Sequence, residues 1–430
     1  MPPWPIFVHC AVGAGLVLRH ALHNNVMNET TTKFFPYLER LLDGEEVEWK
    51  TLGEVAEFKR GQTITQKTAQ TGVYPVISGG QQPAYYIDQY NRTGQTITVA
   101  GSGAYAGFVM FWDEPIFVSD SFSIKADEEV VLPRYVFHFL LNKQNSIFNL
   151  KRGSGVPHVY AKDLAAFSIP IPPLRVQARI VEILDKFTQL EAELEAELEA
   201  RRKQYAYYRD QLLNFSQYPP LNVNIEWKTL GEVCHIVGRI GFRGYTRNDI
   251  VERGEGAISI SPTNIVNQNL NLSAEKNTYI SWEKYNESPE IMIRIGDIVL
   301  AKTASVGKAA LVRELKEKAT INPQMVVLKE ISCLPAYLVY YICTPNFQLR
   351  LKSLSGQGSV PNISQAKLKT IPIPIPPLSE QRRIVDILDR FDTLTNSISE
   401  GLPKEIALRR KQYAYYRDAL LSFPRPEVSA

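Results

Sequence analysis

The string RRKQYAYYRD occurs twice in the chain, at residues 201–210 and 409–418, and this duplication indicates how the chain is organised. Two further strings repeat in the same order, WKTLGEV at 49–55 and 227–233 and IPIPPL at 169–174 and 373–378. The three pairs are offset by 178, 204 and 208 residues, so the second half gains 26 residues and then 4 more. Ordinary repeat arrays have periods of roughly 20 to 50 residues. The repeated unit here is a whole domain followed by a helix, a copied frame around a variable insert.

Length and composition indicate a globular protein of two or three domains. The 430 residues allow this at about 100 to 200 residues per domain, and 44% hydrophobic with 22% charged residues is typical of soluble chains. The cysteines form no CxxC pair, which predicts neither a zinc site nor a disulfide framework and favours a cytoplasmic location. The apolar run 6–18 is too short to cross a bilayer. We interpret residues 1–26 as an upstream extension, with a signal peptide as the alternative.

Each half ends in a long helix with a coiled-coil pattern. Residues 176–215 contain no Pro or Gly, and apolar side chains recur at alternating steps of three and four. The second copy repeats this pattern from 384 to 423 with a four-residue insertion, and Gly401 and Pro403 predict a kink or short break there. Ser379 is the expected N-cap of that helix. We expect the two helices to pair antiparallel, because each carries a stripe that it cannot bury alone.

The inserts are predicted to be mixed α and β domains. Residues 96–112 and 297–312 each alternate as a strand, a glycine-containing turn and a strand. Helices are expected near 133–142 and 335–343. Counting Lys and Arg against Asp and Glu gives 11 and 10 for residues 49–174, but 18 and 12 for residues 227–378. If nucleic acid is the target, we expect a partner to supply part of the positive charge.

The sequence contains no complete catalytic motif of the kinds considered below. The string KTASVGK at 302–308 resembles a phosphate-binding loop, but Lys302 replaces its first glycine and Ala309 replaces the Ser or Thr that binds magnesium. No dinucleotide-binding loop and no nucleophile elbow is present. His138, His158 and His235 are isolated and are interpreted as structural. We therefore predict no catalytic residue, no metal and no cofactor.

Side chains suited to base edges and phosphates lie instead on the glycine-rich segments. Arg and Lys donate to guanine, and Gln or Asn pairs with adenine, in the major groove. For any single residue a solvated surface position is the alternative, so the prediction rests on the clusters 59–66 and 239–247, which follow the two copies of WKTLGEV. The predicted DNA-binding residues are Lys59, Arg60, Gln62, Gln66, Lys67, Tyr105, Lys151, Arg152, Arg239, Arg243, Arg247, Lys302, Lys308, Lys352 and Gln357.

The repeated strings resemble the specificity subunit of type I restriction-modification systems. WKTLGEV, IPIPPL with the following RIVEILD or RIVDILD, and RRKQYAYYRD carry the resemblance, which covers about residues 34–423. It implies an α+β fold with two target recognition domains that each read half of a split double-stranded DNA sequence. Two long helices, packed as an antiparallel coiled coil, would set the gap and dock two methyltransferase subunits, and restriction subunits would join them. This subunit itself would catalyse nothing and would not enter a membrane.

The resemblance also gives domain boundaries and docking residues. We expect a partly disordered extension at 1–44, recognition domains at 45–174 and 223–378, spacer helices at 175–222 and 379–423, and a tail at 424–430. The N-terminus and the break at 401–403 depart from the family pattern. A repeat-built protein scaffold, or the specificity protein of a single-chain restriction system, remains an alternative. The predicted docking residues are Arg201, Lys203, Tyr207, Arg209, Arg409, Lys411, Tyr415 and Arg417.

Overall fold

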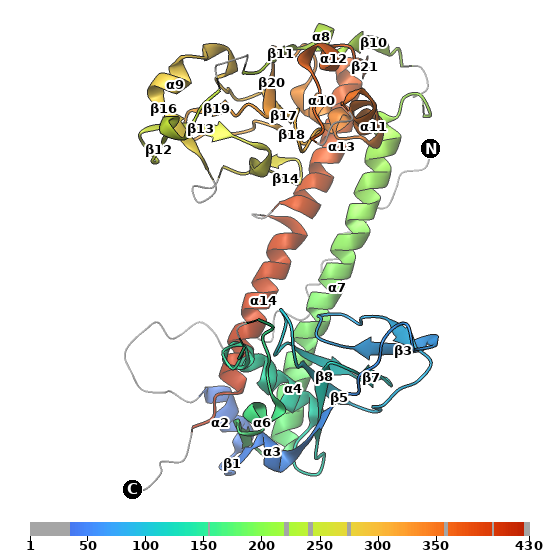
Figure 1. Cartoon of the computed structure of the whole chain (residues 1–430), viewed down its shortest axis with the longest axis vertical. Helices are drawn as coiled ribbons and strands as arrows, with labels where there is room; N and C mark the ends of the chain where they lie inside the picture. The colour runs from blue at the N-terminus through green and yellow to red at the C-terminus, as the bar shows by residue number, and fades with distance from the viewer. Residues whose placement is uncertain are drawn as a thin grey trace. The chain divides into compact units, whose positions relative to one another are not determined.

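The computed structural model divides the chain into two compact units (Figure 1). The first unit comprises residues 1–187 and 412–430, and the second comprises residues 188–411. The structure describes residues 35–153, 155–218, 223–239, 244–272, 277–356, 360–397 and 400–424. The predicted disorder of the N-terminal extension falls mostly on residues 1–34, which lie outside these ranges. Residues 36–42 form helix α2 (Pro36–Leu42), in which Leu38 is fully buried in the core of the first unit.

Two of the copied strings pair with each other in each unit. Strand β1 (Glu48–Thr51) runs antiparallel to β9 (Ser168–Ile171), and β10 (Glu226–Thr229) runs antiparallel to β21 (Pro372–Ile375). A one-turn helix follows each first strand, α3 (Leu52–Val55) or α8 (Leu230–Val233). Both helices begin with a capping box, in which the threonine amide donates to the glutamate three residues later at 2.6 Å. The copied strings therefore join the beginning of each domain to its end through a two-stranded antiparallel pair.

A four-stranded sheet with the same strand order lies at the centre of each unit. In the first unit the order is β2-β8-β5-β6, and in the second it is β11-β20-β17-β18. Both sheets place the fourth of their strands in the chain between the first and the second. The bounds are β2 (Ala56–Arg60), β5 (Thr96–Ala100), β6 (Val109–Trp112) and β8 (Ser121–Ala126), and β11 (His235–Val237), β17 (Ile298–Ala301), β18 (Ala309–Leu311) and β20 (Met325–Lys329). The two predicted strand-turn-strand segments are thus confirmed as the hairpins β5–β6 and β17–β18.

The same helices complete each core. Helix α4 (Pro133–Asn142) packs on the first sheet, α10 (Pro335–Ile342) contacts β18 in the second, and both match the predicted ranges (Figure 1). Tyr135 and Tyr337 are buried and donate to the carbonyls of Pro170 and Pro374 at 3.1 and 2.6 Å. Shorter helices follow, α5 (Gln144–Phe148) and α6 (Ala161–Ala165) in the first unit, and α11 (Pro345–Leu354) and α12 (Gln365–Lys369) in the second.

The inserts differ mainly between the first two strands of each sheet. The offset between equivalent residues rises from 178 at Ala56 and Cys234 to 201 at Ala100 and Ala301, so 23 of the 26 extra residues enter there. The first unit builds a small sheet from β3 (Thr71–Ile77), β4 (Tyr86–Ile87) and β7 (Phe117–Val118). The second builds a sheet of β12 (Ile250–Val251), β13 (Gly256–Ile260), β16 (Tyr279–Ser281) and β19 (Ala319–Ile321), with the hairpin β14 (Ile265–Val266) and β15 (Asn269–Leu270) and helix α9 (Trp282–Asn286).

The long helices run as the heptad pattern predicts, with one break. Helix α7 spans Leu174–Leu213, and the second copy forms α13 (Leu378–Asn396) and α14 (Gly401–Leu420). The predicted break is confirmed, because α14 begins at Gly401, whose φ of +73° suits glycine. The predicted cap was wrong. Helix α13 already begins at Leu378, after Pro377, and Ser379 lies inside its first turn.

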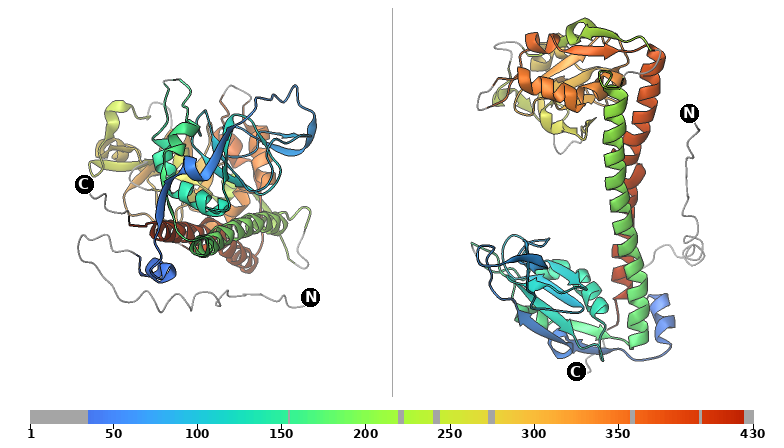
Figure 2. Two further views of the ribbon diagram at one scale, coloured as in Figure 1. Left: turned by 90° about the horizontal axis from the view of Figure 1, so that it is seen from below. Right: turned by 90° about the vertical axis from the view of Figure 1, so that its right-hand side faces the viewer.

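Within the second unit α7 lies beside α13 and α14 (Figure 2). Leu194 of α7 is buried with Leu402 and Ile406 of α14, and Tyr205 lies near Phe391 of α13 with ring centroids 6.2 Å apart. Contacts further along α7 thus reach residues earlier in the second copy, which confirms antiparallel pairing. Arg410 adds ion pairs across the same helices to Glu191 and Glu195. No helix among the described residues is long and apolar enough to cross a membrane.

Candidate DNA interface

Most of the predicted DNA-binding residues of the first unit lie at one end of its central sheet. The register pairs Arg60 at the end of β2 with Phe122, and Ala100 at the end of β5 with Ser121, the first residue of β8. The loops 61–70 and 101–108 therefore leave the sheet at the same end. Loop 61–70 carries Gln62, Gln66 and Lys67, all exposed. The glycine-rich turn 101–108 carries Tyr105, which is 48% exposed.

A third loop joins this end of the sheet. The amide of Gly103 donates to the carbonyl of Pro157 at 3.0 Å, and the amide of Val159 donates to the carbonyl of Gly101 at 3.0 Å. Lys151 donates through Nζ to the carbonyl of Ala104 at 3.2 Å, so it lies beside the turn that holds Tyr105. The segment that contains Gly79 also packs closely against the turn. A Cβ on Gly79 would lie 2.6 Å from the carbonyl oxygen of Ser102, so there is no room for a side chain there. The loops form one connected surface.

The basic side chains of this surface differ in how freely they can reach a ligand. Lys59 is exposed on β2, with Nζ 3.0 Å from Glu57. Arg60, at the end of the same strand, is exposed. Arg152 is exposed and pairs with Asp163 at 3.3 Å. The Lys59–Glu57 pair is exposed and such pairs contribute little to stability, so Lys59 can exchange a carboxylate for a phosphate at small cost. Asp163, the partner of Arg152, is only 15% exposed.

The second unit repeats the arrangement with different side chains. Its turn 302–308 joins β17 to β18, at the end of the sheet equivalent to that of turn 101–108. A later loop again packs on this turn, because the amide of Ala304 donates to the carbonyl of Pro361 at 2.9 Å and Thr303 donates through its hydroxyl to Asn362 at 2.9 Å. The segment after β11 leaves the same end of the sheet, as the segment after β2 does in the first unit.

The predicted residues of the second unit fall into three groups. Arg247, Lys308 and Lys352 are exposed, and Lys302 is half-buried at the start of the turn. Arg243 and Gln357 lie outside the described residues. Arg239 is only 6% exposed and donates through Nε to the carbonyl of Ile321 at 2.9 Å. A direct contact of Arg239 with DNA is therefore not supported, because its guanidinium is used inside the fold.

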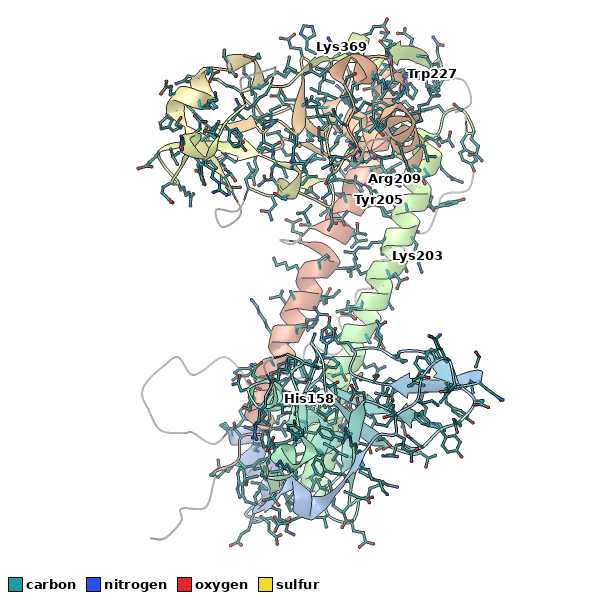
Figure 3. All side chains as sticks on the ribbon, in the orientation of Figure 1. His158, Lys203, Tyr205, Arg209, Trp227 and Lys369 are labelled. Atoms are coloured by element: carbon teal, nitrogen blue, oxygen red, sulfur yellow. The ribbon has the colours of Figure 1, made fainter. Side chains whose placement is uncertain are left out.

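The two copies of RRKQYAYYRD have equivalent side-chain contacts; Figure 3 labels Lys203, Tyr205 and Arg209 of the first copy. Tyr207 and Tyr415 are each 59% exposed and rest edge-on against the next tyrosine in the chain, with centroids 5.5 and 5.4 Å apart. Arg209 and Arg417 are largely buried, each 3.0 Å from the following aspartate. The remaining predicted docking residues are on the helix surface, with Arg201, Lys203 and Arg409 in ion pairs one turn away to Glu197, Glu199 and Glu405, and Lys411 exposed.

Both buried arginines are held in equivalent aromatic surroundings. The guanidinium of Arg209 lies 5.8 Å from the ring centroid of Tyr205, and that of Arg417 lies 5.5 Å from the centroid of Tyr413. These two arginines therefore stabilise the helix ends, and the exposed part of each copy is its tyrosine and lysine.

Two cations of the first unit, Arg92 and Lys125, were not among the predicted DNA-binding residues. Arg92 and Lys125 line an open pocket with Lys59 on the face of the central sheet. The alternation of β8 could have indicated Lys125, but nothing in the sequence around Arg92 indicates its place. Among the described residues no group of His, Cys, Asp and Glu could hold a metal ion.

The sequence of the chain is similar to that of a known protein family over most of its length. A family model described as type I restriction modification DNA specificity domain matches residues 44–200 and 222–408. The specificity subunit of the Escherichia coli type I restriction enzyme EcoR124I/EcoR124II is 36% identical over 416 residues, which cover 91% of this chain and 98% of that protein. A putative type I restriction enzyme specificity subunit of Haemophilus influenzae is 32% identical, covering 90% and 98%.

The fold is also similar to that of a solved structure. The crystal structure of the S subunit of a type I restriction-modification system from M. genitalium matches with a TM-score of 0.57 at 17% identity. The match covers 89% of this chain and 98% of that one.

Proposed function

Since the chain belongs to the type I restriction-modification DNA specificity family, and is thus a non-catalytic subunit for sequence-specific DNA recognition, we propose that each unit reads one part of a split DNA sequence. The observation that carries this proposal is the pair of equivalent sheets whose equivalent ends bear different loops. Two readers with one architecture and different side chains suit two half-sites of different sequence.

We assign different tasks to different residues of the predicted DNA-binding set. Gln62 and Gln66 of the first unit, with Arg243 and Arg247 of the second, are proposed to contact base edges, because amide and guanidinium groups can make paired hydrogen bonds there. Lys151 and Lys352 are proposed to contact phosphates, which fix the position of a protein on the duplex without reading sequence. The other exposed residues of the predicted set would support these contacts.

We further propose that the exposed tyrosine and lysine of each RRKQYAYYRD copy dock one methyltransferase subunit, giving two in all. Tyr207 and Tyr415 are exposed aromatic side chains, a residue type that is enriched at protein interfaces. Lys203 and Lys411 lie one turn before them on the helix surface. Restriction subunits would join the complex through the methyltransferase subunits or beside them, in the cytoplasm.

An exchange of inserts tests DNA reading directly. Residues 56–168 are replaced by the equivalent insert of another family member, and the methylated sequence of the host genome is determined by methylation-sensitive sequencing. A DNA reader changes one half of the methylated sequence and keeps the other. The reciprocal exchange of residues 234–372 should change only the other half. An unchanged methylation pattern in both chimaeras would support the protein scaffold instead.

A further inference from the structure

The two central sheets use one of their faces differently. In the second unit this face carries Val237, Val299 and Val327, which pack in an apolar core with the extra sheet of that unit. The equivalent positions in the first unit, fixed by the same strand pairing, are Lys59, Thr98 and Ser123. The first unit thus leaves polar and charged side chains on a face that the second unit covers with apolar ones.

An open pocket lies on this polar face. Its lining includes three cations, Lys59, Arg92 and Lys125, and a single carboxylate, that of Glu57. Tyr90 and Thr93 add hydroxyl groups at the same pocket. The ionisable groups of the lining therefore sum to two positive charges, and the hydroxyl groups are further hydrogen-bond donors. This combination suits an anion with several oxygens.

Two of the three cations of the pocket, Arg92 and Lys125, form no ion pair within the described part of the fold, whereas Lys59 pairs with Glu57. Glu57 is the cross-strand neighbour of Lys125, yet its nearest ion pair is with Lys59 at 3.0 Å. Arg92 donates to Ser123 Oγ at 2.7 Å and to the carbonyls of Asn91 and Arg60 at 2.7 and 3.0 Å. Among the described residues neither Arg92 nor Lys125 is in an ion pair with a carboxylate.

The second unit has a lysine at the equivalent position in a different environment. Lys329 is equivalent to Lys125, and its Nζ lies 2.8 Å from Asp297 and 2.6 Å from the carbonyl of Met292. Asp297 takes the place of Thr96, which lines the pocket in the first unit. The lysine at this strand position is thus in an ion pair in the second unit, whereas among the described residues it is in no ion pair in the first.

We propose that the pocket on the first sheet binds a phosphate of the DNA backbone, with Lys59 and Lys125 as mobile cationic ligands around the fixed guanidinium of Arg92. This inference rests on the proposed function. Lys59 lies three residues before Gln62, a strand distance of roughly 10 Å, so one duplex can reach both the pocket and the base-reading loops. An open site admits a phosphate that is part of a polymer chain.

The test compares DNA binding by full-length protein assembled with its methyltransferase subunits. The variants are Lys125→Gln, the double variant Lys59→Gln and Lys125→Gln, and the control Lys186→Gln, an exposed lysine of α7 that pairs with Glu182 at 2.7 Å. Fluorescence anisotropy is measured with a duplex carrying the methylated sequence and with a scrambled duplex, over a series of salt concentrations. Each lost contact should weaken binding to both duplexes by roughly fivefold, and should lower the slope of log K against log salt by about 0.9. The methylated sequence should not change.

The alternative outcomes are distinct. If both pocket variants behave as Lys186→Gln does, the phosphate site is wrong, although wild-type discrimination between the duplexes still supports the proposed function. If wild type does not prefer the methylated sequence, the proposed function fails first. Weakening confined to the specific duplex would make Lys125 a base-reading residue and overturn the assignment. Inorganic phosphate that binds the wild-type chain and is not displaced by DNA would identify a small-anion site instead.

Discussion

A buried histidine should make the stability of the first unit depend on pH. His138 of α4 is fully buried, with Nε2 2.7 Å from Asp185 and Nδ1 3.0 Å from the hydroxyl of Tyr413 on α14. Burial lowers the pKa of His138 and outweighs the opposing effect of Asp185, while the charges of Arg134 and Arg417 lower it further. In the unfolded chain this pKa is about 6.5. Between the two pKa values the unfolded state binds one more proton.

The free energy of unfolding should therefore be highest above pH 6.5 and fall as the pH drops below it, by at most about 1.4 kcal/mol per pH unit. Asp185 contributes in a separate range. Burial raises its pKa, but the hydrogen bonds of His138 and Arg134 lower it more, so its net pKa lies below the ordinary 3.8 and its contribution is lost only in stronger acid. The region between pH 5 and pH 7.5 thus reports on His138 alone within this cluster.

The informative variant is His138→Tyr, because the second unit has Tyr340 at the equivalent place, with its hydroxyl 2.6 Å from Asp389. Hydrogen exchange of residues 413–420 measures the local free energy of opening between pH 5 and pH 7.5. We expect protection in wild type to weaken toward pH 5 beyond the intrinsic pH dependence of exchange, and this extra loss to vanish in His138→Tyr. His235→Gln, which changes an exposed histidine, is the control. An equal extra loss of protection toward pH 5 in wild type and in His138→Tyr would contradict the role given to His138. The variant His138→Gln provides a second test in case the tyrosine variant packs poorly.

Two further predictions concern the helices. Deleting residues 403–406 removes the four-residue insertion, about 6 Å of helix, and should change the gap between the methylated half-sites while leaving both half-sites intact; unchanged spacing in methylome sequencing would contradict a spacer role. Tyr207→Ala and Tyr415→Ala should each remove one methyltransferase subunit from the complex in native mass spectrometry. Leu408→Ala, which truncates another exposed side chain of α14, should remove none, and full occupancy in both tyrosine variants would place docking elsewhere.

The frame of the fold was predictable from the sequence because its signals are local. The alternating hairpins, the helices that begin at Pro133 and Pro335, and the break at Gly401 each follow from residues within one or two turns of one another. The pairing of WKTLGEV with IPIPPL was not predicted. The paired strands are about 120 residues apart in the first unit and about 146 in the second, and a short antiparallel pair leaves no pattern in either string alone.

The candidate site was predicted by residue type and position but not by environment. The cluster 59–66 was predicted from its place after WKTLGEV, and the sheet brings the loop after β2 and the turn between β5 and β6 to one end. Whether a cation is free to contact DNA depends on tertiary packing, which cannot be read from the neighbouring residues in the sequence. Arg239 was expected at the surface and is buried. Arg92 and Lys125 become neighbours only through the sheet and the segment that crosses its face.

The division between copied and divergent parts follows the two faces of the central sheet. One face binds the frame, and there the contacts are duplicated as well as the sequence. Gln177 and Gln381 are buried and accept from the amides of Leu132 and Leu334 at 2.9 Å, and they donate to the carbonyls of Pro172 and Pro376 at 2.8 Å. A change on this face leaves a buried polar group without a partner, which costs about 1 to 3 kcal/mol.

The other face carries no such constraint, and it is where the units differ most. One unit buries it under an apolar sheet, and the other leaves it charged beside an open pocket. The loops that leave the sheet end can also change without touching the duplicated hydrogen bonds of the frame. Under the proposed function, such an arrangement lets each unit change the DNA sequence that it reads while its helices and the proposed docking surfaces stay the same. A substitution confined to the charged face should therefore alter DNA affinity and leave assembly with the methyltransferase subunits intact.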